Sequence, residues 1–402
     1  MEWKEVDICQ LCDSVSETYK GNASEVVLIN TSDVLDGKCL NHEYVPNKKL
    51  KGQFKKTFRK GDILYSEIRP ANKRFCFVDF EPKDYIASTK LMVLRAHEDV
   101  DPQYLYQILR SNDTLAQLQM LAESRSGTFP QITYSELSNI MVSLPSQKAQ
   151  KNIVSILSSL DRKIELNNKI NADLEEMAQA IFKNWFVDFE PFKDCKFVDS
   201  ELGMIPEGWK VGRLDEIADV VGGSTPSKAK PEYYTQKGIA WLTPKDLSNH
   251  PAVYTSRGVI DITEEGYNST STKLMPKGTI LFTSRAPIGY ISIAQNDICT
   301  NQGFKSLVPK KAGTCFLYCF LKYVTPEIEN KSTGSTFKEA SGSLMKSLQV
   351  IMPEQKVFED FETIVSPLFA RIESLEKENS RLSLLRDTLL PRLMSGEIEV
   401  PE

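Results

Sequence analysis

The chain has 402 residues, of which 41% are hydrophobic and 26% charged, as in ordinary globular proteins with two or three domains. No apolar run approaches the ~18 residues of a membrane-spanning helix, and the first residues, MEWKEVDICQLC, carry acids where a secretory signal would be basic and then apolar. We therefore expect a cytoplasmic protein without membrane contact. The net charge of −5 does not by itself indicate nucleic-acid binding, so any DNA-binding surface must be local.

Eight cysteines are spread along the chain, and in an intracellular protein of this length they are not expected to form disulfides. Cys9 and Cys12 form a C-x-x-C pair, and Cys315 and Cys319 are one helical turn apart. A structural zinc would require a four-cysteine site assembled across two domains. The alternative, small buried thiols, leads us to predict no metal site.

Residues 1–146 are predicted to form a first globular domain. Its expected elements, in chain order, are a strand entering a short helix at 3–12, a strand and turn at 26–34, β-type runs at 61–69 and 87–96, a helix at 101–123, a turn at 126–129 and a segment at 136–145 that leads into a long helix. Asp101 is the expected N-cap of the helix, with Pro102 at its first position.

A basic run lies in this domain between Tyr44 and Gly61, where the sequence has no acidic residue. The basic residues of the run and of the segment after it are Lys48, Lys49, Lys51, Lys55, Lys56, Arg59 and Lys60, then Arg69, Lys73 and Arg74. Phe54 and Phe58 are interleaved with them. Such a run can neutralise several DNA phosphates. The alternative is a solvated surface loop.

Residues 147–186 contain neither glycine nor proline and predict one unbroken helix, roughly 60 Å long. Apolar residues recur at alternating steps of four and three, for example at Ile153, Leu157 and Leu160, so this helix needs a partner helix. A matching pattern begins 208 residues later, at Gln355, inside a predicted helical segment at 354–396.

The offset of 208 residues relates two copies of one plan, so the chain is an internal repeat. Residues 187–207, rich in proline, glycine and acids, are the expected connector. Residues 208–353 form the second domain, with strand-like runs at 239–247, 278–285 and 300–309. The predicted fold class is α+β: two globular mixed α/β domains separated by two long antiparallel coiled-coil helices, with pseudo-two-fold symmetry.

Polar residues interrupt the apolar seam between the two helices. Asn171 and Asn379 occupy matching positions, and buried asparagines in a heptad core fix register. The two amides are candidates for a hydrogen bond; the alternative is a hydrated, frayed helix middle. Pro367 is expected to kink or restart the second helix, and Arg386 stands where the seam would be apolar.

In the second domain, basic residues are fewer. The candidates for DNA contact are Lys228, Lys230, Lys273, Lys277 and Arg285. They surround two segments rich in hydroxyls, Gly-Gly-Ser-Thr-Pro at 222–226 and Ser-Thr-Ser-Thr at 269–272. Hydroxyls and basic side chains suit contacts with phosphates and with the grooves of DNA.

The sequence lacks catalytic motifs. It has no phosphate-binding P-loop, dinucleotide fingerprint, H-E-x-x-H pair or nucleophile elbow. Asp101-Pro-Gln-Tyr104 differs from the Asp-Pro-Pro-Tyr of amino-methyltransferases, and no glycine-rich cofactor loop precedes it. We therefore predict no catalytic residues and no bound cofactor.

Over essentially its full length the chain resembles the specificity (S) subunits of type I restriction-modification systems. The resemblance is carried by AQAIFKNWFVDFEP (178–191), LLPRLMSGE (389–397), Gly223-Ser-Thr-Pro226, Gly278-Thr-Ile-Leu281 and the Pro-x-Gln entries at Pro145 and Pro353. Each motif is weak alone, but in this order and duplicated they are specific.

The resemblance implies that each globular domain is a target recognition domain for one half of a split sequence in double-stranded DNA. The helices would set the unread spacer and dock two methyltransferase (M) subunits that bind S-adenosylmethionine. Restriction (R) subunits using ATP and Mg would complete the complex, and this chain would be its non-catalytic part. Two rival readings remain: a coiled-coil adaptor that binds no DNA, and a free-standing adenine methyltransferase.

Overall fold

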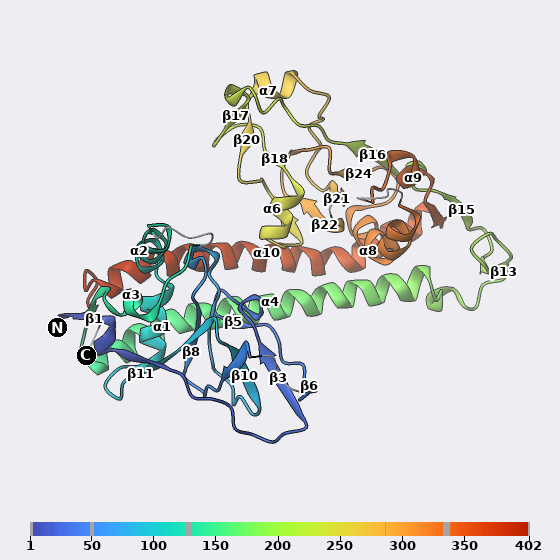
Figure 1. Ribbon diagram of the computed structural model, residues 1–402. Helices are drawn as coiled ribbons and strands as arrows, with labels where there is room; N and C mark the ends of the chain where they lie inside the picture. The colour runs from blue at the N-terminus through green and yellow to red at the C-terminus, as the bar shows by residue number, and fades with distance from the viewer. Residues whose placement is uncertain (1–2, 49–51, 125–129, 286, 333–337, 401–402) are drawn as a thin grey trace. The chain divides into compact units, whose positions relative to one another are not determined.

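The computed structural model describes residues 3–48, 52–124, 130–285, 287–332 and 338–400 (Figure 1). Contacts divide the chain into two compact units: unit 1 comprises residues 1–164 and 381–402, and unit 2 comprises residues 165–380. Each unit takes part of both long helices, α4 (Gln147–Phe186) and α10 (Gln355–Met394). Each long helix, which the sequence predicts as a separate segment, is therefore divided between the two units.

Unit 1 contains two four-stranded sheets and three short helices. Its elements are β1 (Lys4–Asp7), β2 (Cys12–Val15), β3 (Glu25–Ile29), β4 (Val34–Leu35), β5 (Lys38–Cys39), β6 (Val45–Pro46), β7 (Phe54–Lys56), β8 (Ile63–Ser66), β9 (Phe75–Phe77), β10 (Tyr85–Ser88), β11 (Leu91–Ala96), α1 (Pro102–Arg110), α2 (Asn112–Glu123), α3 (Tyr134–Ser138) and β12 (Met141–Leu144). One sheet has the order β2-β11-β8-β9 and the other β6-β3-β10-β7.

Unit 2 is built around a five-stranded sheet with the order β16-β24-β21-β22-β19. Its elements are β13 (Phe197–Val198), β14 (Ile205–Pro206), β15 (Lys210–Arg213), α5 (Leu214–Ile217), β16 (Ala218–Gly222), β17 (Tyr234–Thr235), β18 (Trp241–Leu242), α6 (Pro244–Asn249), β19 (Tyr254–Thr255), β20 (Asp261–Ile262), α7 (Glu264–Asn268), β21 (Ile280–Ser284), β22 (Ile288–Ala294), β23 (Cys299–Thr300), β24 (Lys305–Pro309), α8 (Thr314–Lys331), α9 (Gly342–Ser347) and β25 (Gln349–Met352).

The strand pairings confirm the internal repeat. The order β2-β11-β8-β9 in unit 1 recurs as β16-β24-β21-β22 in unit 2, and the parallel pair β3–β10 recurs as β18–β23. The strand before each long helix pairs with the first strand of its own unit: Lys4 lies opposite Leu144, and Lys210 lies opposite Met352. The two copies thus share strand order and connectivity.

Two segments predicted as continuous are divided. The helix expected at 101–123 is two helices, because Ser111 is extended (φ −62°, ψ 146°) and its hydroxyl caps α2 by accepting from the Thr114 N–H. The β-type run at 87–96 is likewise split, since β10 ends at Ser88 and β11 begins at Leu91. Asp101 caps α1 as predicted, accepting hydrogen bonds from two backbone N–H groups.

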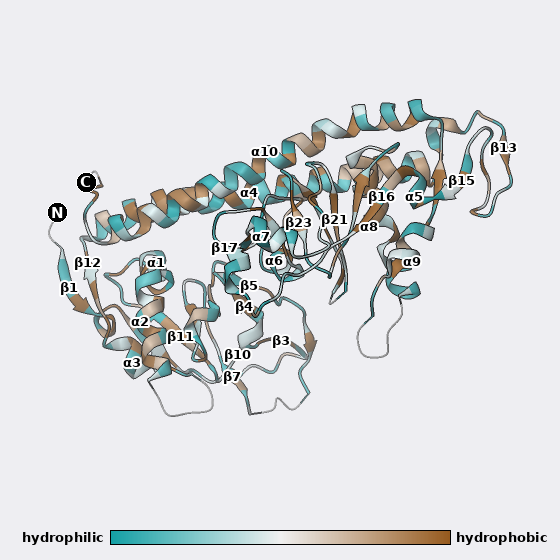
Figure 2. Cartoon of the chain, turned by 90° about the horizontal axis from the view of Figure 1, so that it is seen from above, coloured by the Kyte–Doolittle hydropathy of each residue, from teal (hydrophilic) through white to brown (hydrophobic). Residues whose placement is uncertain are grey.

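The helix α4 has the bounds that its apolar pattern predicts, and α10 lies within the predicted segment at 354–396. Figure 2 shows apolar and polar turns alternating along both helices. Within unit 1, Ile153 and Leu157 of α4 share a core with Leu393 of α10. Within unit 2, Phe182 and Phe361 share another core. Burying each such side chain stabilises the fold by about 1.5–3 kcal/mol.

α10 is continuous through Pro367, so the proline does not restart the helix, which was one of its two expected effects. The proline lies on the exposed side of the helix. The carbonyl of Thr363, which loses its helical donor, is on the same exposed side and can be hydrated, which lowers the cost of the missing hydrogen bond.

A polar layer crosses the helix seam in unit 2, but Asn171 is not the partner of Asn379. The Asn167 amide donates to Asn379 Oδ1 and to Glu378 Oε2, each over 2.9 Å. Asn379 in turn donates to Asn168 Oδ1 over 2.8 Å. Asn167 is fully buried. Its own carbonyl oxygen has no hydrogen-bond partner within the described residues, but its NH2 group bonds across the seam, so the helices are hydrogen-bonded at this layer rather than frayed.

The connector after α4 is part of the unit 2 core. Phe189 and Ile205 of the connector are buried in the same cluster as Phe186, and β13 pairs with β14 in a short antiparallel ribbon. The acidic residues and prolines that predict a linker therefore flank apolar side chains, whose burial fixes the segment to unit 2.

Candidate nucleic-acid interface

The basic run of unit 1 is partly structured. Lys48, Lys55, Arg59 and Lys60 are exposed, whereas Lys49 and Lys51 lie outside the described residues. Lys56 belongs to β7, its Nζ donates to the Leu91 carbonyl over 2.8 Å, and burial lowers the pKa of its ammonium. Phe58 is buried in a core cluster. Exposed cations therefore alternate with residues that hold the segment to the sheet.

The remaining basic residues that the sequence predicts to contact DNA in unit 1 lie in the turn between β8 and β9. Arg69 and Lys73 are exposed and flank a single 3-10 turn at Pro70–Asn72. Arg74 is committed to the fold, because its Nη1 donates to the Ser32 carbonyl over 3.0 Å and to the Val34 carbonyl over 3.4 Å.

In unit 2, four of the five sequence-predicted residues are exposed, namely Lys228, Lys230, Lys273 and Lys277. Lys230 lies on Tyr233: its Nζ is 2.9 Å from the phenol oxygen and 4.9 Å from the ring centroid, and the hydrogen bond raises the pKa of the lysine. Arg285 is half-buried and forms an ion pair with Glu339 at 3.6 Å, and Lys305 pairs with the same carboxylate at 3.5 Å.

The Gly-Gly-Ser-Thr-Pro segment of unit 2 packs against residues 300–302. The Ser224 N–H donates to the Thr300 carbonyl, and Thr225 Oγ1 bonds the Gln302 side chain. A Cβ at Gly223 would lie 2.1 Å from the Asn301 carbonyl oxygen, so only glycine allows this approach. The segment brings a hydroxyl and an amide side by side next to β24.

One arrangement of backbone hydrogen bonds recurs at the end of the central strand in both units, and we call it the strand-end junction (residues 67, 90 and 132 in unit 1; 284, 303 and 340 in unit 2). In unit 1 the Glu67 N–H donates to the Lys90 carbonyl (3.1 Å), and the Glu67 carbonyl accepts from the Ile132 N–H (2.8 Å). In unit 2, Ser284, Gly303 and Ala340 repeat both bonds, at 2.7 and 2.9 Å.

The side chains around the two junctions differ. Glu67 and Lys90 face each other at 3.8 Å in unit 1, where unit 2 has Ser284 and Gly303. Beside the junction, Gln131 in unit 1 corresponds to Glu339 in unit 2 at the repeat offset. Arg69 and Arg285 follow the two junctions in the chain. Sequence reasoning picked out these arginines but not the junctions, because the segments that meet are far apart in the chain.

Sequence reasoning also missed the residues that attach each domain to the helices. In unit 1, Asp161 of α4 accepts from Arg110 of α1 (3.0 Å) and from Arg386 of α10 (2.8 Å). This pairing explains the charge that interrupts the apolar seam. An arginine at an apolar heptad position was the signal that a half-buried carboxylate lies opposite.

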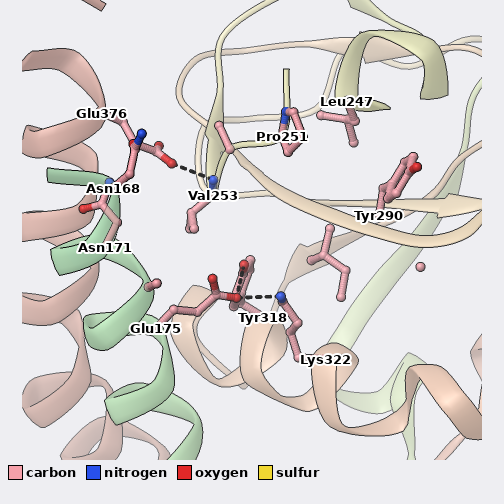
Figure 3. A pocket seen from close by; sticks show the side chains of 14 residues that line it. Asn168, Asn171, Glu175, Leu247, Pro251, Val253, Tyr290, Tyr318, Lys322 and Glu376 are labelled. Atoms are coloured by element: carbon pink, nitrogen blue, oxygen red, sulfur yellow. Dashed lines mark hydrogen bonds and ion pairs between the residues drawn. The ribbon is translucent and has the colours of Figure 1, made fainter. Parts of the chain in front are cut away.

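In unit 2 the attachment is made by carboxylates of the helices (Figure 3). Glu376 accepts from the Val253 and Tyr254 N–H groups at 2.7 and 3.0 Å. Burial raises the pKa of Glu376 to about 7, although the two N–H groups oppose the shift. Glu175 accepts from the Tyr318 hydroxyl (2.8 Å) and from Lys322 Nζ (2.7 Å).

These residues line a half-open cavity of about 450 Å³ in unit 2. Asn171, in the same lining, is 9% exposed, and its carbonyl oxygen has no hydrogen-bond partner within the described part of the chain. Over the described residues there is no group of three or more histidine, cysteine or acidic side chains that could hold a metal ion. Among the same residues, no helix is long and apolar enough to cross a membrane.

Comparison with known proteins identifies the family. The family model described as "Type I restriction modification DNA specificity domain" matches residues 2–176 and 206–383. The chain belongs to this family. Each of its two matches covers one recognition domain together with part of a long helix.

Individual relatives agree. The chain is 33% identical to the specificity subunit of the type I restriction enzyme HindI from Haemophilus influenzae, over 99% of this chain and 100% of the relative. It is 40% identical to the MjaIX specificity subunit from Methanocaldococcus jannaschii, over 47% of this chain and 44% of the relative. The crystal structure of a type I S subunit from M. genitalium shares the fold, with a TM-score of 0.57 at 18% identity, covering 100% of this chain and 97% of that one.

Proposed function

We propose that this chain is the DNA-addressing subunit of a type I restriction-modification complex, and that each recognition domain reads one half of a two-part target. The strand-end junctions are the main support, since both units repeat the same backbone hydrogen bonds with different side chains. Base identity is read by side chains, whereas backbone contacts set position. A common frame with different side chains therefore suits two different half-sites.

The two long helices would fix the length of unread DNA between the half-sites and dock the partner subunits. Their exposed apolar side chains support docking: Met177 and Ile364 in unit 2 are 52% and 48% exposed, and Leu384 in unit 1 is 70% exposed. The partners would be two methyltransferase subunits with S-adenosylmethionine and restriction subunits with ATP and Mg. Under this proposal the partners perform the chemistry in the cytoplasm, and this chain supplies the address.

Methylation mapping tests the proposal. The chain is co-expressed with its neighbouring methyltransferase, and adenine methylation of host DNA is mapped with and without this gene. We expect a split, two-part methylated motif that disappears when the gene is deleted. Methylation that persists without the chain would contradict the proposal and favour a protein-binding adaptor.

Salt dependence of DNA binding tests the basic run. Replacing Lys55, Arg59 and Lys60 together by alanine should lower the slope of log affinity against log salt by about one unit per lost phosphate contact. Lys56→Ala serves as the matched control, because Lys56 bonds the Leu91 carbonyl and should change stability rather than the slope. An unchanged slope in the triple variant would remove the run from the interface.

A further inference from the structure

The turn between β8 and β9 holds two non-glycine residues in the left-handed backbone region. Arg69 has φ 47° and ψ 75°, and Lys73 has φ 51° and ψ 40°. Glycine adopts this region freely, whereas side chains with a Cβ are strained in it. Strain of this kind persists only where the surrounding structure imposes it, and it concentrates at functional sites.

Three separate segments of unit 1 impose the conformation. The Arg69 N–H donates to the Pro130 carbonyl over 3.1 Å. The Ala71 N–H donates to Gln119 Oε1 over 3.0 Å, and the Lys73 carbonyl accepts from the Asp36 N–H over 2.8 Å. The turn is therefore a fixed platform, and Arg69 lies two residues after Glu67 of the strand-end junction.

The strained positions carry exposed cations instead of the glycines that the backbone favours. Their neighbour Arg74 has an ordinary structural task, since it bonds the carbonyls of Ser32 and Val34. Within the described part of the chain, the exposed ammonium of Lys73 has no such hydrogen bond or ion pair. A rigid platform that presents charge loses little entropy on binding a charged partner.

The described residues of unit 2 contain no counterpart of this turn. The connection between β8 and β9 comprises residues 67–74, but the connection between β21 and β22 comprises only residues 285–287. Arg285, at the corresponding strand end, is paired with Glu339 and is not among the residues with positive φ. The strained basic turn is thus particular to the first recognition domain.

We propose that the turn Arg69–Lys73 is a preformed DNA-contacting element of the first recognition domain, with Arg69 and Lys73 contacting the first half-site. This inference rests on the proposed function and deepens it. It assigns affinity for one half-site to two residues whose backbone strain is tolerated because their side chains bind DNA.

Glycine substitutions separate this role from a structural one, because they should move stability and binding in opposite directions. We would compare wild type with Arg69→Gly/Lys73→Gly in the full chain co-expressed with its methyltransferase. The probe is a duplex carrying the split motif found by methylation mapping. Lys73→Gly alone should unfold at a higher temperature, and the double variant should bind about tenfold or more weakly and show a salt slope lower by up to about two units.

Two further variants serve as controls. Asp36→Gly relieves a left-handed residue (φ 42°) in the adjoining hairpin without removing a cation, so it should raise the unfolding temperature and leave affinity unchanged. Lys73→Arg keeps the charge and should keep the affinity.

Each contrary result overturns the inference. A stabilised double variant with unchanged affinity would place the turn outside the interface. A destabilised Lys73→Gly single variant would show that the backbone is not strained there. Weaker binding by Asp36→Gly would trace the loss to a loosened backbone instead of lost cations. If the wild-type complex showed no preference for the split motif over a scrambled duplex, the proposed function itself would fail, and the inference with it.

Discussion

The two recognition domains are attached to the long helices by different chemistry. In unit 1, helix α1 bears its own N-cap, Asp101, and reaches α4 through the Arg110–Asp161 ion pair. In unit 2, the equivalent helix α8 starts at Gly313, which has no capping side chain, and Glu362 of α10 accepts from the Phe316 N–H over 2.8 Å and the Cys315 N–H over 3.3 Å.

The difference shows that the repeat conserves the need for a cap but not the residue that meets it. A helix begins with N–H groups that have no partner inside the helix. Unit 1 satisfies these N–H groups with Asp101, the residue just before the helix. In unit 2 the Glu362 carboxylate of the long helix satisfies them, so one contact both caps α8 and attaches it to α10. Gly313 is needed for this, because a Cβ there would lie 2.1 Å from the Glu362 carboxyl carbon.

The largest expected effect is in unit 1. Asp161→Ala leaves Arg110 and Arg386, which are 10% and 18% exposed at the side chain, without their shared carboxylate. We expect the free energy of unfolding to fall by about 3 kcal/mol, as when one partner of a buried ion pair is removed. Denaturant unfolding measures it. Asp387→Ala, at a 54% exposed side chain that pairs with Arg386, should cost under about 1 kcal/mol. Equal losses would contradict the bridging role of Asp161.

The two caps offer a matched comparison. Glu362→Ala removes both cap and anchor, so it should lower the free energy of unfolding by about 2 kcal/mol, whereas Asp101→Ala removes a local cap and should cost about 1 kcal/mol. Chemical denaturation of the two variants side by side gives the ratio. If Asp101→Ala lowers the free energy of unfolding as much as Glu362→Ala does, then attachment to the long helix adds no stability beyond that of the cap.

We predict that the stability of unit 2 depends on pH through Glu376. Its pKa is raised from the usual 4.5 to about 7, so the folded state binds this proton more tightly than the unfolded state. The stabilising contribution is fully present below pH 4.5 and is lost as the pH rises through about 7. The slope should not exceed about 1 kcal/mol per pH unit, since the group is partly exposed. Thermal unfolding of wild type and Glu376→Gln across this range measures it, and parallel profiles would refute the assignment.

The smallest effect concerns the helix seam of unit 2. Asn171→Leu removes a buried amide whose carbonyl oxygen has no partner in the described part of the chain, and should stabilise the protein by about 1 kcal/mol. Asn167→Leu should do the opposite, because it deprives Asn379 and Glu378 of a donor. A loss of stability in both variants would mean that Asn171 also has a structural role.

Much of the architecture could be predicted from local signals. Forty-residue stretches with a heptad pattern gave both long helices their bounds, the repeat offset gave the second domain, and Asp101-Pro102 gave a helix start. Ser111 had a capping sequence of its own, Ser-Asn-Asp, yet the apolar periodicity on both sides of it predicted one continuous helix.

The candidate site could be predicted less well, because its geometry depends on segments distant in sequence. Lys56 reads as one more cation of a basic run, and only the position of β10 turns its ammonium toward the Leu91 carbonyl. The turn with left-handed residues at Arg69 and Lys73 contains no glycine from which it could have been predicted. The repeat offset aligns Asn171 with Asn379, but in the antiparallel helices it is Asn167 that lies opposite Asn379.

The return of residues 381–402 to unit 1 has a consequence for biosynthesis. Leu393 and Val400 are buried in the same core as Ile8 and Leu11, so this core is incomplete until the last of these residues has left the ribosome. Unit 2 is one continuous stretch and can close earlier. During translation the N-terminal domain usually folds first. Here we expect the second domain to fold before the first, although the first is synthesised earlier.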